Sequence, residues 1–170
     1  GFSGRLNLNL REDKGFTYGA SSSIRFATLQ SILVGSAPVE SSVTKDALEQ
    51  LIAEFDALAT WDRPVTDEEL AHAKENLVRG FAQRYETLAQ VAGKVAELNG
   101  YGLPLDEMSR YTDKIELITK EQLEAAASKY LSTEDAILLV IGDAEKVAAG
   151  VASLEFGELT HLDADGEPIG

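Results

Sequence analysis

Residues 2–20 of the chain read Phe-Ser-Gly-Arg-Leu-Asn-Leu-Asn-Leu-Arg-Glu-Asp-Lys-Gly-Phe-Thr-Tyr-Gly-Ala, and this stretch decides the fold more than any other. Its first half alternates leucine with polar residues, which is the period of a β-strand. After the glycine at position 15, Phe16–Phe26 alternates again and predicts a strand. The stretch also places Arg11 and Tyr18 seven positions apart.

Strand and helix patterns are segregated along the rest of the chain. The β-prone run Ile32–Val39 follows the first strand closely enough to form an antiparallel hairpin with it. A helical pattern covers Lys45–Ala59, with Thr44 as the expected N-cap. The remaining predicted elements are helices opened by the capping boxes Thr66–Glu69 and Thr119–Gln122, a helix over about 88–98, a buried strand over Ala136–Ile141, a helix over Asp143–Ser153, a short strand over Glu158–Leu162 and a turn over Asp163–Gly166.

This order of elements indicates the fold class. Runs of strands followed by runs of helices are typical of α+β domains rather than of doubly wound parallel sheets. We therefore expect a layered α+β fold, with a mostly antiparallel sheet and helices packed on one face. The length of 170 residues is enough for one sizeable core and predicts one domain.

The composition excludes several classes of function. The net charge is −14, from 29 acidic and 15 basic residues, which argues against nucleic acid and anionic membranes as partners. The absence of cysteine excludes disulfides, thiol catalysis and Cys-based zinc sites. No apolar run approaches the roughly 18 residues that span a bilayer. An acidic surface would suit attraction of basic peptides, although it more often serves solubility alone.

No complete catalytic or metal site is visible in the sequence. A zinc peptidase needs two histidines and a carboxylate on one metal, but this chain has only His72 and His161, which are far apart. Glu68 and His72 could share a helical face, yet the charged residues around them favour an exposed helix surface. No serine lies in a nucleophile elbow, and no glycine-rich segment has the lysine of a phosphate loop.

Five segments of the chain resemble, in order, the C-terminal half-domain of the pitrilysin/insulysin family of zinc metallopeptidases, which includes the mitochondrial processing peptidase. The densest is Arg-Leu-x-x-x-Leu-Arg-Glu-x-x-Gly-x-x-Tyr at its start. The others are Pro64-Val-Thr-Asp-Glu-Glu-Leu-Ala-His-Ala-Lys-Glu-Asn-Leu, Tyr101-Gly-Leu-Pro-Leu-Asp, Ile118-Thr-Lys-Glu-Gln-Leu and Leu139-Val-Ile-Gly-Asp. Together they cover residues 2 to about 145.

The resemblance implies a structure and a site. The first residues would form a helix ending near Lys14, with Gly15 as its C-terminal cap, instead of the strand that their period suggests. The half-domain would cover residues 1–162, followed by a tail over 163–170, and its opening strand and helix would be missing before residue 1. Arg11 and Tyr18 would hold the substrate. The alternative is a purely structural role, with Arg11 at a helix end and Tyr18 on a half-buried strand.

The resemblance also implies partners. Zinc would belong to the N-terminal half, on the same or a separate polypeptide, and this chain would bind none. A peptide would be the substrate, and the isolated chain could self-associate through uncovered apolar surface. Two alternatives stay open: a structural or inactive partner subunit of the same fold, such as a respiratory-complex core-like protein, and an unrelated acidic α+β binding domain.

Overall fold

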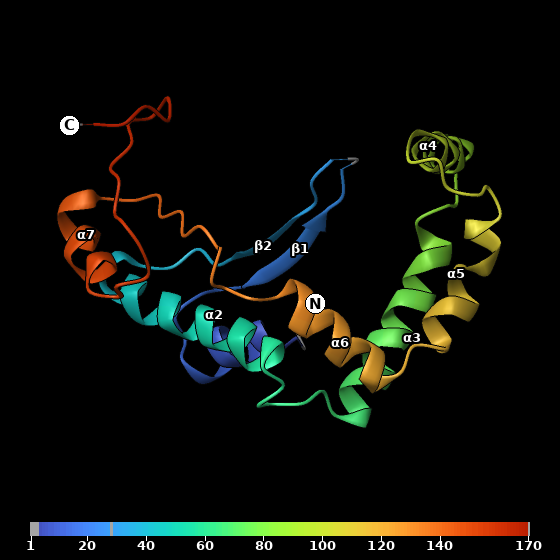
Figure 1. Ribbon diagram of the computed structural model, residues 1–170, viewed down its shortest axis with the longest axis horizontal. Coiled ribbons are helices and arrows are strands. Elements are labelled where there is room, and N and C mark those ends of the chain that lie inside the picture. The colour runs from blue at the N-terminus through green and yellow to red at the C-terminus, as the bar shows by residue number, and fades with distance from the viewer. Residues whose placement is uncertain (1–3, 28, 170) are drawn as a thin grey trace. The chain divides into compact units, whose positions relative to one another are not determined.

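The computed structural model describes residues 4–27 and 29–169, which form two compact units (Figure 1). Of the described residues, the first unit contains 4–26, 31–55 and 133–169. The second contains 27, 29–30 and 56–132. The described part of the chain combines helices with a two-stranded antiparallel sheet, so the predicted α+β class is confirmed. Among these residues, no helix is both long and apolar enough to cross a membrane.

The first unit begins with a helical segment. A short α-helix, α1 (Arg5–Asn7), continues directly into the π-helical segment η1 (Leu8–Asp13). Gly15 then adopts a left-handed φ of +64°, which a glycine tolerates at a helix C-terminus. The helix implied by the family resemblance is confirmed, and the strand indicated by the leucine period is wrong.

The burial of the leucines explains why this segment is a helix and not a strand. Leu10 is completely buried and Leu6 packs against the same core, whereas Leu8 remains half exposed. Residues four apart share one face of a helix, so Leu6 and Leu10 together anchor a helical segment.

A β-hairpin follows the helical segment (Figure 1). Strands β1 (Ser21–Arg25) and β2 (Ile32–Ser36) pair antiparallel, with Ser21 opposite Ser36 and Arg25 opposite Ile32. The predicted hairpin is therefore confirmed, but β1 is shorter than the expected Phe16–Phe26 strand. Residues 16–20 lie outside the sheet because the backbone there bonds to side chains instead of to β2.

Helix α2 (Thr44–Ala59) packs one of its faces against the hairpin. Leu51 and Phe55 of α2 approach Gly35 so closely that a Cβ at this position would lie 2.6 Å from the Phe55 ring. The core between these elements contains Leu10, Ala20 and Ala47, with Phe16 and Val39 at its margin.

Thr44 does not cap α2 as predicted. A 3₁₀ turn, η2 (Ser41–Val43), precedes the helix, and the Thr44 hydroxyl donates to the carbonyl oxygen of Glu40 at 3.3 Å. Thr44 already has helical dihedral angles (φ −57°, ψ −47°), whereas an N-cap residue has an extended backbone, so its side chain is not placed to cap the helix. Helix α7 (Ala144–Ala152), which was predicted, packs beside η2 in the same unit.

The predicted buried strand over Ala136–Ile141 is wrong. The run is irregular, and Ile137, Leu139 and Ile141 are 92%, 71% and 90% exposed. Within the described residues, the backbone of residues 137–141 makes no hydrogen bond. A strand needs a paired neighbour, and among these residues β1 and β2 pair only with each other.

The predicted strand over Glu158–Leu162 is also wrong. This segment bends back on itself, so that Leu162 forms a single bridge with Pro168 and the Ile169 N–H donates to the His161 carbonyl. At the bend, Asp163 Oδ1 accepts hydrogen bonds from the N–H groups of Asp165 and Glu167, both at 2.9 Å. The turn predicted over Asp163–Gly166 is therefore confirmed.

The second unit is helical. Its helices are α3 (Asp67–Gln83), α4 (Leu88–Gly100), α5 (Glu107–Glu116) and α6 (Lys120–Tyr130). The predicted capping boxes open α3 and α6, and a third box, Thr87–Gln90, opens α4. Helices α3 and α5 lie side by side (Figure 1), where Phe81 stacks on Tyr111 with ring centroids 4.6 Å apart.

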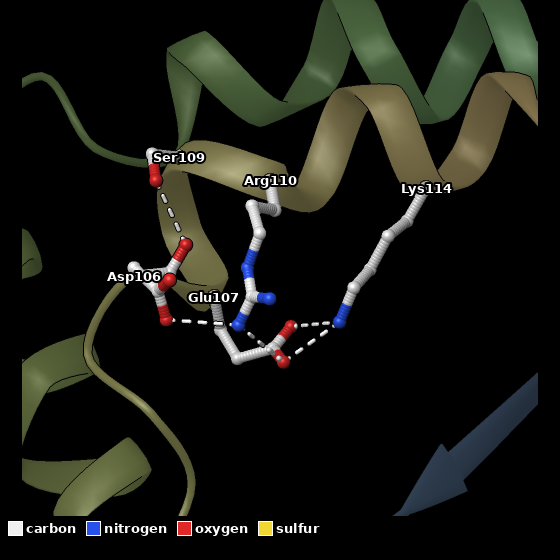
Figure 2. A network of polar contacts seen from close by, with 5 residues as sticks. All are labelled: Asp106, Glu107, Ser109, Arg110 and Lys114. Carbon is white, nitrogen blue, oxygen red and sulfur yellow. Dashed lines mark hydrogen bonds and ion pairs between the residues drawn. The ribbon is translucent and has the colours of Figure 1, made fainter.

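Helix α5 had no counterpart in the sequence prediction, because much of its surface is polar. A network of side chains holds its exposed face together, as Figure 2 shows. Lys114 donates to both carboxylate oxygens of Glu107, at 2.7 and 2.6 Å, and Arg110 bonds to Asp106 at 2.8 Å. The Ser109 hydroxyl adds a hydrogen bond to the Asp106 carbonyl at the helix start.

Candidate functional site

Arg11 lies in the last turn of η1, next to the fully buried Leu10. Its side chain is 37% exposed, and its Nε is 3.5 Å from the carboxylate of Glu12. A cation at a helix C-terminus is stabilised by the partial negative charge of the last carbonyl groups. The guanidinium is thus held at the surface of the first unit by a helix whose other face is in the core.

Tyr18 lies in the bend between η1 and β1, and its side chain is 97% exposed. The prediction placed it on the strand itself, but β1 begins only at Ser21. The residues around Tyr18 are buried, with Thr17 at 8% and Ala20 at 6% exposure. A large aromatic ring therefore projects into solvent from a backbone that is itself packed against the protein.

Two polar side chains fix that backbone. Asn7 Nδ2 donates to the carbonyl oxygen of Ala20 at 2.6 Å, and the Ala20 N–H donates back to Asn7 Oδ1 at 2.8 Å. The Thr17 hydroxyl donates to the Pro38 carbonyl at 2.6 Å and accepts the Gly19 N–H at 3.1 Å. Asn7 and Thr17 are 6% and 8% exposed, so these bonds are shielded from water.

Sequence reasoning did not find Asn7 or Thr17. In the sequence Asn7 is one of several polar residues in an alternating run, and its burial follows only from the helical conformation. The sequence did bring Arg11 and Tyr18 to notice, and the structure places both on the first unit, joined through the turn at Gly15.

The two histidines, His72 and His161, lie in different units of the chain. His72 lies on α3, at a shallow surface groove of the second unit lined by Glu68, Ala71, His72, Lys74, Glu75, Val78, Arg79 and Glu116. Two of these lining residues are bonded to each other, because Lys74 Nζ donates to the Glu116 carbonyl at 2.7 Å. His161 lies in the terminal bend of the first unit. In residues 4–27 and 29–169, no three His, Asp or Glu side chains are grouped so that they could hold a metal ion.

Comparisons with known proteins identify the class to which this fold belongs. Residues 1–77 match the sequence model of the peptidase M16 inactive domain. A crystal structure of a peptidase M16 inactive domain from Pseudomonas fluorescens is similar to the chain with a TM-score of 0.69 and 25% sequence identity, over 78% of this chain and 31% of that one. A protease from Helicobacter pylori has the same fold, with a TM-score of 0.59 and 21% identity, over 78% of this chain and 32% of that one.

These findings confirm the predicted resemblance. The fold is that of the non-catalytic half of a peptidase, and the first 77 residues of the chain resemble the inactive domain of the M16 peptidase family. It spans about a third of the length of the two structures that it matches. No curated protein matches the chain.

Proposed function

We propose that this chain is the non-zinc half of a zinc metalloendopeptidase. It would form one wall of the peptidase chamber and hold the substrate peptide through Arg11 and Tyr18. The partner would be the zinc-bearing N-terminal half, on the same polypeptide or on a separate one.

The observation that carries the proposal is the exposure of Tyr18 on an anchored backbone. Burial of a tyrosine side chain is normally favourable, and its hydroxyl normally finds a partner. Here the ring is 97% exposed, while side-chain hydrogen bonds hold the residues on both sides of it. This arrangement presents a preorganised aromatic donor to a ligand, and preorganisation reduces the entropic cost of binding.

Arg11 supplies the complementary chemistry. A guanidinium is permanently charged and planar, so it donates hydrogen bonds to a peptide carbonyl in a fixed geometry that lysine does not maintain. If the carbonyl near Arg11 is the one attacked, the side chain stabilises the developing oxyanion better than the ground state. Removal of one such donor typically costs about 2.7–4 kcal/mol of transition-state stabilisation.

The residues that the structure describes do not fit a zinc ion. His72 and His161 belong to different units, and the described residues contain no group of three possible ligands. The metal and its general base would therefore come from the partner half, and the role of this chain is limited to binding and orienting the peptide. Its net charge of −14 would favour basic peptides through long-range attraction.

Site-specific photo-crosslinking tests the contact with substrate. The full protein, assembled with its zinc-bearing half, would carry p-benzoylphenylalanine in place of Tyr18 and be irradiated with a labelled basic peptide. We expect a covalent adduct at position 18. The matched control is the same replacement at Tyr130, an exposed tyrosine on α6 of the other unit.

Two results would argue against the proposal. Equal labelling at positions 18 and 130 would mean that the adduct reflects exposure alone. Failure to crosslink at position 18 while the assembled enzyme cleaves the same peptide would favour the alternative, a structural or partner subunit that does not contact substrate.

A further inference from the structure

We infer that Asn7 is a positioning residue that fixes the Tyr18 segment relative to the helix carrying Arg11. This inference rests on the proposed function, because it assigns Asn7 an effect on substrate through Tyr18. The carboxamide of Asn7 reaches from α1 to the segment just before β1, thirteen residues further along the chain. It therefore links the two parts of the site.

The geometry of the contact is two-sided. One carboxamide donates to the Ala20 carbonyl at 2.6 Å and accepts the Ala20 N–H at 2.8 Å. This pattern mimics a neighbouring strand, and it satisfies both backbone groups of a residue that is only 6% exposed. Because both bonds involve the same residue, the Ala20 backbone can neither slide nor rotate without breaking one of them.

The consequence reaches Tyr18 through a short, tethered segment. Thr17 bonds to Pro38 at one end, and Asn7 bonds to Ala20 at the other, so Tyr18 lies between two fixed points. If the bond to Ala20 is lost, the segment is held at one end only. Misplacement of a substrate-contacting group by about 1 Å can lower a rate by roughly a hundredfold.

Asn9 offers a matched control on the same helical segment. It too is an asparagine whose side-chain amide is hydrogen-bonded, although it is half-buried: Nδ2 donates to Gln50 at 3.1 Å and to Glu54 at 2.7 Å. Both of these partners belong to α2, away from the Tyr18 segment. Asn9→Ala should therefore weaken the fold through the same kind of loss as Asn7→Ala, without releasing Tyr18.

The experiment is a double-mutant cycle in the protein assembled with its zinc-bearing half, with a quenched-fluorescent basic peptide as the probe. We expect Asn7→Ala to lower kcat/KM by about ten- to a hundredfold and Asn9→Ala to leave it nearly unchanged. In a Tyr18→Ala background, Asn7→Ala should add little further loss, because residues that act through one another are not additive. Asn7→Asp keeps the acceptor for the Ala20 N–H but replaces the donor to the Ala20 carbonyl with a second acceptor in a buried position, so it should also release the segment and lower kcat/KM.

Hydrogen exchange gives a readout that does not depend on turnover. The Ala20 amide should be protected in the unsubstituted chain and in Asn9→Ala, and should exchange faster in Asn7→Ala. If Asn7→Ala fails to fold, the same two measurements, kcat/KM and exchange of the Ala20 amide, are compared between Asn7→Asp and Asn9→Ala.

The possible failures can be told apart. If Tyr18→Ala alone leaves kcat/KM unchanged, the proposed function fails and the positioning role fails with it. If Tyr18→Ala lowers kcat/KM but the Asn7→Ala loss is equal with and without the tyrosine ring, the function stands and the positioning role is overturned. Unchanged exchange of the Ala20 amide in Asn7→Ala would also overturn it.

Discussion

In the N-terminal helix, the alternating sequence pattern does not predict which side chains enter the core. Leu6 and Leu10 enter the core while Leu8 does not, although all three occupy equivalent places in the alternating sequence. Asn7 and Asn9 lie among these leucines and carry hydrogen bonds to two other segments of the unit, the residues just before β1 and helix α2. Burial of a polar side chain in such a position costs little free energy only when its hydrogen bonds are formed.

Gly35 is the residue at which packing is tightest. A methyl group there would lie 2.6 Å from the Phe55 ring, so Gly35→Ala forces α2 away from the hairpin or tilts the ring. Overpacking of this kind costs about 1–3 kcal/mol, and we expect that loss in the free energy of unfolding from denaturant titration.

Gly93, in the middle of α4, provides the matched control for Gly35. Nothing lies within 4 Å of a Cβ at this position, so Gly93→Ala should be neutral or stabilising by up to about 1 kcal/mol. Equal effects of the two substitutions would show that helix α2 does not approach the hairpin at Gly35.

At the level of elements, helix starts were the most predictable feature. The Thr-x-x-Glu and Thr-x-x-Gln signatures opened α3 and α6 where the sequence placed them, because the capping box is a local interaction. The start of α2 was different, since the Thr44 hydroxyl is used by the preceding turn. The position at which the helix starts therefore depends on the path of the chain before Thr44, and helix propensities do not predict that path.

Strands were less predictable for a related reason. The hairpin was predicted correctly because its two runs are neighbours in sequence and can pair with each other. Ala136–Ile141 has the composition of a buried strand, but whether it becomes one depends on a distant partner. Of the site, the sequence indicated Arg11 and Tyr18, while the anchoring residues Asn7 and Thr17 required the tertiary contacts to be known.

The ion network on α5 makes a prediction about pH. A hydrogen bond from Lys114, assisted by the charges of Lys114 and Arg110 and opposed by desolvation, lowers the pKa of Glu107 below its ordinary value of 4.5. A carboxylate with a lowered pKa in the folded state contributes stability above the unfolded pKa, and this is lost as the pH falls through the folded pKa.

We therefore expect Glu107→Gln to lower the Tm at neutral pH, and the difference from the unsubstituted chain to shrink below about pH 4.5. The shift should be small, because the network is on the surface. Glu124→Gln, on α6, should show no such dependence, as Glu124 makes no ion pair or hydrogen bond through its side chain with another described residue. A Tm difference for Glu107→Gln that grows on acidification would contradict this account.

For the whole molecule, the uncovered run Ala136–Ile141 predicts association. Exposed, unpaired and apolar backbone segments are templates for pairing with another chain. We expect the isolated chain to self-associate, and sedimentation to show an average mass that rises with concentration. Leu139→Lys, which places a charge in the run, should reduce this association.

Leu117→Lys is the control for association, because Leu117 is 76% exposed but stands outside the run. Singly exposed leucines are common on monomeric proteins and should not drive pairing. A strictly monomeric chain at high concentration, or equal effects of the two lysine substitutions, would contradict the prediction.

We propose that this chain, which is similar to M16 inactive domains, holds the substrate of a zinc-bearing partner half through Arg11 and Tyr18. The most direct test of this proposal is kcat/KM of the assembled peptidase carrying Arg11→Ala or Tyr18→Phe, with thermal stability and zinc content measured on the same samples. We expect a loss of about one to three orders of magnitude in kcat/KM, with thermal stability and zinc content nearly unchanged. Unchanged kcat/KM, or a loss that follows a fall in stability, would show that the two residues are structural.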